Sequence, residues 1–315
     1  MFYNSGTPQV AGAPTPFGFV NQDGNPNLKP EKAKTWTAGI VLSSPYHSPW
    51  TDGLRVSVDW YKINISDAIE TEAVDDVQAA CLSQDASTPA ALAAAVASAA
   101  CAAVSRNTGT GAMGPTGIQY ENLATISTSG IDVQLDWTVM LADMGLSKVP
   151  GAIQLSALVT YLNYMDTIST PGGPVTHWAG SLGPTLTGLD PGAFKYKTNT
   201  TLTYLVGPMS VGINWRFLPH VHSASYPTDP STTCAGCFQD TKAFHDFDLF
   251  GTYTIKKNYT FRAGIQNLFN VQPPTTGAQA ANFPIYNAID GQGITNESFY
   301  DALGRRFYIG LNAKF

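Results

Sequence analysis

A strict alternation of apolar and polar residues recurs along this chain, and it constrains the fold more than any other feature. The clearest example is the stretch 131–141, in which every second side chain is apolar. A period of two residues is typical of a β-strand with one apolar face. About nine such segments are present, near residues 33–44, 53–66, 124–142, 151–167, 193–206, 209–219, 243–256, 258–270 and 305–315.

The lengths of the segments and of their connections favour a strand-based membrane protein. A tilted strand needs about 10 residues to cross a bilayer, and most of the segments reach that length. The connections alternate between short ones, at 45–53, 145–151, 207–208 and 256–258, and long ones, at 67–123, 168–192, 220–242 and 271–304. Short periplasmic turns and long extracellular loops are the layout of outer-membrane barrels. The sequence therefore predicts an all-β fold, an antiparallel transmembrane β-barrel fragment with about nine long strands.

Composition and motifs exclude several other classes of protein. The net charge is −6 and Lys and Arg do not cluster, which argues against nucleic-acid binding. No apolar run reaches the roughly 18 residues of a transmembrane helix. The triplet Gly109-x-Gly111-x-x-Gly114 lacks the βαβ setting of a dinucleotide site, and neither G-x-S-x-G nor H-E-x-x-H occurs. We therefore expect no enzyme activity and no cofactor.

The longest connection, 67–123, contains an alanine-rich stretch and two cysteines. Residues 89–104 predict a helix that lies between Cys81 and Cys101. With Cys234 and Cys237 the chain has four cysteines, all in predicted loops, which is typical of an oxidising compartment. We expect disulfides Cys81–Cys101 and Cys234–Cys237. A zinc site is the alternative for the second pair, with ligands drawn from His220, His222, Cys234, Cys237 and His245.

The polar residues of the alternating segments are expected to line a lumen. They include acidic and basic side chains in mixed order, namely Arg55, Asp59, Asp132, Asp136, Arg216 and Arg262. A catalytic role for the three aspartates is the alternative. Large aromatic residues near strand ends are expected to form the interfacial girdles of a membrane barrel, or a core if the protein were a soluble sandwich. They are Trp36, Trp60, Tyr61, Trp137, Tyr161, Tyr204, Trp215 and Tyr259.

Three stretches resemble the C-terminal half of the TonB-dependent receptor family. Residues 25–39 are similar to its N-P-x-L-x-P-E entry into a mid-barrel strand. Residues 264–270 are similar to the N-L-F-N ending of its penultimate strand, and residues 300–315 to its last strand with a terminal Phe. The resemblance divides the chain into an extracellular loop remnant, 1–30, and part of the barrel, 31–315, whose terminal strand is 305–315.

The resemblance implies energy-coupled import of a scarce nutrient across the bacterial outer membrane. The ligand would be a siderophore–iron complex, cobalamin, haem or an oligosaccharide, and TonB–ExbB–ExbD would supply energy through a plug domain. Residues Tyr308, Gly310, Ala313 and Phe315 resemble the signal read by the barrel-assembly machinery. Loop residues that could contact a ligand are His177, Trp178, His220, His222 and Phe238.

The sequence departs from the family pattern at its front. Nothing in it resembles a TonB box, a plug or a signal peptide. We therefore expect part of a longer receptor, inactive alone, with an open sheet whose two edges would lack partners in lipid. The alternatives are a passive porin-like channel and a secreted β-rich binding or hydrolytic domain.

Overall fold

The computed structural model describes most of the chain, which divides into two compact units. The described residues are 20–46, 48–71, 77, 80–81, 83–85, 87–106, 113–168, 172–182, 192–223, 240–256, 258–274, 295 and 299–314. Unit 1 comprises Met1–Lys34, Asn64–Ile126 and Thr167–Val175. Unit 2 comprises Thr35–Ile63, Ser127–Asp166 and Thr176–Phe315.

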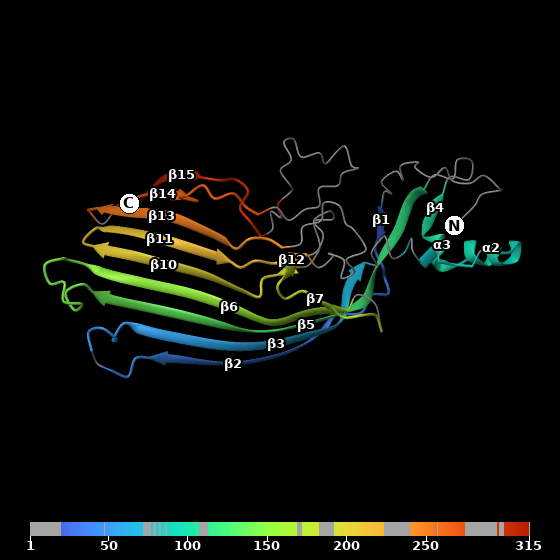
Figure 1. The fold of residues 1–315 in the computed structure, drawn as a ribbon, viewed down its shortest axis with the longest axis horizontal. Helices are drawn as coiled ribbons and strands as arrows, with labels where there is room; N and C mark the ends of the chain where they lie inside the picture. Colours follow the sequence, from blue (N-terminus) through green and yellow to red (C-terminus); the bar gives the residue numbers. More distant parts are fainter. Residues whose placement is uncertain are drawn as a thin grey trace. The chain divides into compact units, whose positions relative to one another are not determined.

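Nine strands form one hydrogen-bonded path in the order β15-β14-β13-β11-β10-β6-β5-β3-β2 (Figure 1). They are β2 (Lys32–Ser43), β3 (Leu54–Thr71), β5 (Met113–Met140), β6 (Ala152–Ile168), β10 (Tyr196–Val206), β11 (Met209–Leu218), β13 (Phe244–Ile255), β14 (Tyr259–Gln266) and β15 (Arg306–Ala313). All nine predicted strands are therefore present. Within the described residues the path ends at β2 and β15 and does not close, as expected from the sequence.

The alternation of short and long connections is also confirmed. Short connections join β2 to β3, β5 to β6, β10 to β11 and β13 to β14, and in unit 2 they lie together at one end of the strands, on the left in Figure 1. The other connections are long. The long strands thus lie in the sheet in the same order as along the chain, which is the meander expected of an outer-membrane barrel.

Two strands extend further than the alternation predicts. Strand β3 reaches Thr71 rather than residue 66, and β5 begins at Met113 rather than residue 124. The early part of β5 pairs with β1 (Val20–Asp23) in parallel and with β4 (Val104–Arg106) in antiparallel orientation. These partners pair with backbone between residues 113 and 119, a stretch whose sequence has no clean alternation of its own.

Strand β14 ends earlier than predicted, at Gln266 rather than residue 270. Asn267 and Asn270 both have positive φ, 50° and 53°, a conformation that Asn tolerates better than most residues. The buried Asn267 side chain accepts from the Val271 amide at 2.7 Å and donates to the Val271 carbonyl at 2.9 Å. The N-L-F-N sequence is therefore a turn that ends the strand.

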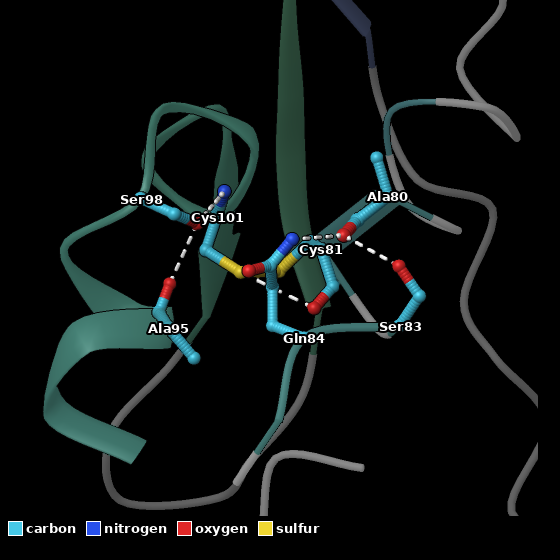
Figure 2. Close-up of a disulfide and its surroundings, with 7 residues drawn as sticks. All are labelled: Ala80, Cys81, Ser83, Gln84, Ala95, Ser98 and Cys101. Carbon is cyan, nitrogen blue, oxygen red and sulfur yellow. Dashed lines mark hydrogen bonds between the residues drawn. A yellow bond between two sulfur atoms is a disulfide. The ribbon is translucent and has the colours of Figure 1, made fainter. Parts of the chain in front are cut away.

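Unit 1 contains the alanine-rich helix, in two pieces. Helix α2 (Pro89–Val96) begins after Thr88, whose hydroxyl accepts from the Ala91 amide at 3.1 Å, and α3 (Ala99–Ala102) follows directly. A disulfide joins Cys81 to Cys101, with 4.6 Å between their Cα atoms (Figure 2). Neither helix is long and apolar enough to cross a bilayer.

The long connections of unit 2 contain short strands that the sequence does not predict. Strand β7 (Thr176–His177) pairs with β6. Strands β8 (Ser181–Leu182), β9 (Gly192–Ala193) and β12 (His222–Ser223) form a separate sheet in the order β12-β8-β9. This sheet carries part of a small hydrophobic core, which bears on the candidate site.

Candidate functional site

The pairing registers of unit 2 define two faces of the sheet. Directly opposed residues lie on the same face, so a row of partners can be followed from strand to strand. One row contains only apolar residues: Leu155, Leu202, Ile213, Leu249, Ile265 and Phe307. The neighbouring row on the opposite face begins Ser156, Thr201, Asn214 and Asp248. We call these the apolar face and the polar face.

Side chains on the polar face are joined by hydrogen bonds between strands. Asp136 of β5 accepts from Ser156 of β6 at 2.8 Å, and also from Gln134 of its own strand at 2.7 Å. Asn214 donates to Asn199 at 2.6 Å and to Thr201 at 2.9 Å. Because each strand contributes polar atoms to its neighbour, the strands keep their register as well as a hydrophilic surface.

Alternate residues of a strand lie on the same face, and residues that alternate with a polar-face residue are said here to have polar-face parity. All six residues predicted to line a lumen have this parity. Arg216 and Arg262 follow from the registers, and Asp132 has the parity of Asp136. The Tyr61 hydroxyl of β3 lies over Gly130 of β5, which is two residues from Asp132 and therefore has its parity. Arg55 and Asp59 have the same parity on β3 as Tyr61. The mixed charge expected of the polar face is therefore gathered on one surface of the sheet.

A packed apolar cluster, here called the loop cap, lies at the end of the strands with the long connections. Leu218 and Phe244 have polar-face parity on β11 and β13 and oppose each other. Aromatic rings meet edge to face, with Phe194 and Phe244 at 5.9 Å and 5.5 Å from Tyr300. The cap consists of Leu182, Phe194, Leu218, Val221, Phe244 and Tyr300, with Val271 and Phe299 packed against it. Three long connections contribute to it.

A cavity of about 490 Å³ lies between the loop cap and the polar face. Its volume falls in the range of ligand sites. Residues of the cap and of β3, β5, β6, β9, β10 and β11 line it, namely Tyr61, Thr128, Thr160, Leu162, Met165, Gly192, Ala193, Phe194, Lys197, Arg216, Leu218 and Phe299. Two of them, Lys197 and Arg216, are cationic, and none is acidic.

Arg216 is held by a buried carboxylate that is not itself part of the cavity lining. Its guanidinium donates to Asp246, which opposes it in the register and whose side chain is only 3% exposed. The Arg216 side chain remains 44% exposed. The buried partner therefore fixes the direction of the guanidinium while part of it faces the cavity.

The apolar face carries an aromatic cluster near the same strand ends. Trp215 stacks on His245 at 5.9 Å and on Phe247 at 6.2 Å, and its indole N–H donates to His245 Nδ1 at 3.2 Å. This position of Trp215 agrees with an interfacial girdle. The girdle prediction is wrong for Tyr61, which lines the cavity on the polar side, because its ring fills the space left by Gly130.

The apolar stripe of β5 is partly covered rather than fully exposed. Val139 is 2% exposed and Leu141 is buried. At this end of β5 the neighbouring connection folds close, and the Trp137 indole donates to the Trp50 carbonyl at 2.7 Å. Alternation alone could not show that these side chains are buried.

Among the described residues, the predicted ligand contacts His177, Trp178, His220 and His222 do not line the cavity. His177 is exposed and its Nδ1 lies 2.7 Å from Asp166 Oδ1, while the Trp178 amide donates to the Met165 carbonyl. His220 and His222 are exposed. Phe238, Cys234 and Cys237 lie outside the described residues. His245 belongs to the apolar face, and the described residues contain no group of three metal-ligating side chains, so the zinc interpretation gains no support.

The residues of the predicted assembly signal occupy the edge strand β15. Tyr308 has polar-face parity and its hydroxyl lies over Gly264, while Gly310 makes room for Arg262. Ala313 ends the strand opposite Tyr259. Phe315 lies outside the described residues. The loop cap and the cavity carry no local sequence motif from which they could be found.

Comparison with protein-family models matches residues 1–268 to the family described as TonB dependent receptor-like, beta-barrel. Two structures of mutants of the ferric enterobactin receptor from Pseudomonas aeruginosa, both in complex with enterobactin, have a similar fold. One is 20% identical with a TM-score of 0.55, and the other is 18% identical with a TM-score of 0.54. In both comparisons 93% of this chain and 33% of the other are covered, so the chain spans about a third of the length of these relatives. A search of curated proteins finds no match.

Proposed function

Because the chain belongs to the TonB-dependent receptor β-barrel family, we propose that it forms part of the barrel of a receptor that imports a scarce nutrient across the outer membrane. Members of this family are outer-membrane proteins of Gram-negative bacteria, and they are transport receptors rather than enzymes. The predicted localisation and the predicted lack of enzyme activity are thereby confirmed.

The observation that carries the proposal is the family match over residues 1–268. The sheet, which is open within the described residues, adds to it. A sheet that ends at β2 and β15 leaves two rows of backbone groups without partners in lipid, where each such group costs several kcal/mol. Within the described residues β15 pairs only with β14, and its free edge fits further strands of a longer receptor. The proposed partners are those strands, outer-membrane lipid, the barrel-assembly machinery, and TonB–ExbB–ExbD acting through a plug domain.

The substrate classes that we propose are siderophore–iron complexes, cobalamin, haem and oligosaccharides. The test is uptake of radiolabelled members of each class in cells with and without the gene for the full-length receptor, each with and without TonB. We expect one class to be taken up only when both genes are present. Uptake that persists without TonB would refute the proposal and favour a passive channel.

We propose further that the apolar face contacts lipid and the polar face lines the lumen. Arg placed at Leu135, on the apolar face of β5, should destabilise the assembled barrel by about 2–4 kcal/mol, whereas Arg at the neighbouring Gln134 should be nearly neutral. Heat-modifiable migration of the full-length receptor after urea titration measures the difference. Equal destabilisation by Leu135→Arg and Gln134→Arg would contradict this assignment of the faces.

A further inference from the structure

We infer that the cavity beneath the loop cap binds an anionic group carried by a small apolar or aromatic molecule. This inference rests on the proposed import function and names the chemistry of its ligand. The cavity lies on the face that we assign to the lumen, at the end of the strands with the long connections. A ligand that enters between the long connections would meet it before reaching the rest of the polar face.

The charge of the lining is the first argument. Lys197 and Arg216 lie on the same face of neighbouring strands, because Asn199 opposes Arg216 and Lys197 is two residues from Asn199 along β10. Asp246 offsets one of the two positive charges. One cation thus remains uncompensated in the lining of a chain whose net charge is −6. A local excess of positive charge in an acidic protein favours an anion at that place.

The donors in the cavity are the second argument. Within the described residues Lys197 forms no ion pair, and the Arg216 guanidinium has N–H groups beyond the one that Asp246 accepts. The hydroxyl-bearing residues Thr160 and Tyr61 also line the cavity, whereas the hydroxyl of the third, Thr128, donates to the Tyr164 carbonyl at 3.2 Å. Ammonium, guanidinium and hydroxyl donors together match the oxygen atoms of a carboxylate or a phosphate.

The apolar residues of the lining favour a particular kind of group next to the anion. Phe194 and Phe299 come from the loop cap, with ring centroids 5.4 Å apart, and Met165 and Leu162 come from β6. Aromatic and thioether side chains are suited to flat apolar groups. The lining therefore fits a molecule with an oxyanion at one end and a ring at the other better than a neutral sugar.

The test measures binding to the purified full-length receptor in detergent, without TonB. The probes are benzoate, phenyl phosphate and the neutral benzyl alcohol, observed by ligand NMR at concentrations on the order of 1 mM, because such small molecules bind weakly. We expect at least one of the two anions to bind about tenfold more tightly than benzyl alcohol, and its affinity to fall as NaCl is raised. The preferred anion identifies the oxyanion as carboxylate or phosphate.

A matched pair of variants locates the binding. Lys197→Met should weaken binding of the preferred anion about fivefold or more, because the uncompensated cation is lost while the apolar stem is kept. Lys148→Met makes the same chemical change in an exposed short connection and should leave binding unchanged. Equal affinity for benzoate, phenyl phosphate and benzyl alcohol, or equal binding by the Lys197→Met and unchanged proteins, would overturn the inference.

These outcomes are separable from those of the import test. Anion binding with uptake that does not depend on TonB would refute the import proposal and leave the site in place. TonB-dependent uptake of a neutral ligand, with no anion bound by the purified receptor, would refute the site alone.

Discussion

Two regions of long connections in this molecule are ordered by different means. In unit 1 the connection between β3 and β5 is rich in alanine, and a disulfide and two short helices hold its described residues. In unit 2 the connections hold large side chains, and Leu182, Val221 and Tyr300 are almost fully buried in the loop cap. Alanine has too little surface to form a core alone, whereas leucine and aromatic residues bury enough to hold several connections together. The comparison shows that a covalent link holds the described residues of one region, whereas packed large side chains hold those of the other.

The largest effect should come from the ion pair beneath the loop cap. Arg216→Met leaves the Asp246 carboxylate buried without its partner, and we expect a loss of about 3–5 kcal/mol in the free energy of unfolding. The loss of free energy should lie near the lower end of this range, because the Arg216 side chain is 44% exposed. Urea unfolding of the full-length receptor measures it, with Arg262→Met as the control on the same face. Equal stabilities of the two variants would show that the buried pair does not support the cap.

The disulfide should have the next largest effect, confined to unit 1. Replacing both Cys81 and Cys101 by Ser removes a link that closes a loop with a sequence separation of 20, which corresponds to roughly 3 kcal/mol. We expect faster proteolysis within residues 80–106 and an unchanged midpoint for the sheet. If the midpoint of the sheet fell as well, the two regions would not be independent. Mass spectrometry without reduction shows whether Cys81–Cys101 and the proposed Cys234–Cys237 disulfide form.

The helix cap at Thr88 should contribute less than the disulfide. Thr88→Ala removes the hydroxyl that accepts from the Ala91 amide, and the expected loss is about 1 kcal/mol within unit 1. Proteolysis of the same segment, with and without reductant, provides the measurement. Thr88→Ser retains the hydroxyl and should behave as the unchanged protein. A Thr88→Ala effect equal to that of the cysteine variants would mean that the helix, not the covalent link, orders the segment.

The smallest effect should appear at high pH in the loop cap. Burial raises the pKa of the Tyr300 phenol, so the folded protein holds this proton more tightly than the unfolded chain does. The stabilisation is complete below the unfolded pKa of about 10 and is lost as pH rises through the folded pKa. Tyr300→Phe should therefore lose less stability than the unchanged protein between about pH 9 and pH 11. Parallel losses in the two proteins would exclude Tyr300 as the cause.

Several features followed directly from the residues. The alternating segments predicted all nine long strands, because one side chain in two faces each environment whatever the neighbouring strand is. The stretch from Pro89 predicted helix, since alanine favours it in most contexts. The same alternation assigned residues such as Asp136 and Arg216 to one face. These predictions depend only on local geometry.

Other features required partners that are distant in sequence. Strand β5 begins at Met113 because β1 and β4 supply hydrogen bonds, and no pattern within residues 113–123 announces them. Tyr61 was assigned to a girdle, and its place on the polar face depends on Gly130 of the next strand. The histidines were chosen as ligand contacts for their chemistry, yet the cavity is lined by Lys197, Arg216 and the loop cap.

By itself, the sequence determined the strands, the two faces of the sheet and the family, because these depend on the period of the side chains and on short motifs. Only the tertiary structure decided where the cavity lies. Three long connections meet in one hydrophobic core over the polar face, and the free energy of that packing comes from side chains such as Leu182, Val221 and Tyr300 that are far apart along the chain. A cluster of this kind has no period and no fixed spacing, so its members can be recognised only when they are in contact.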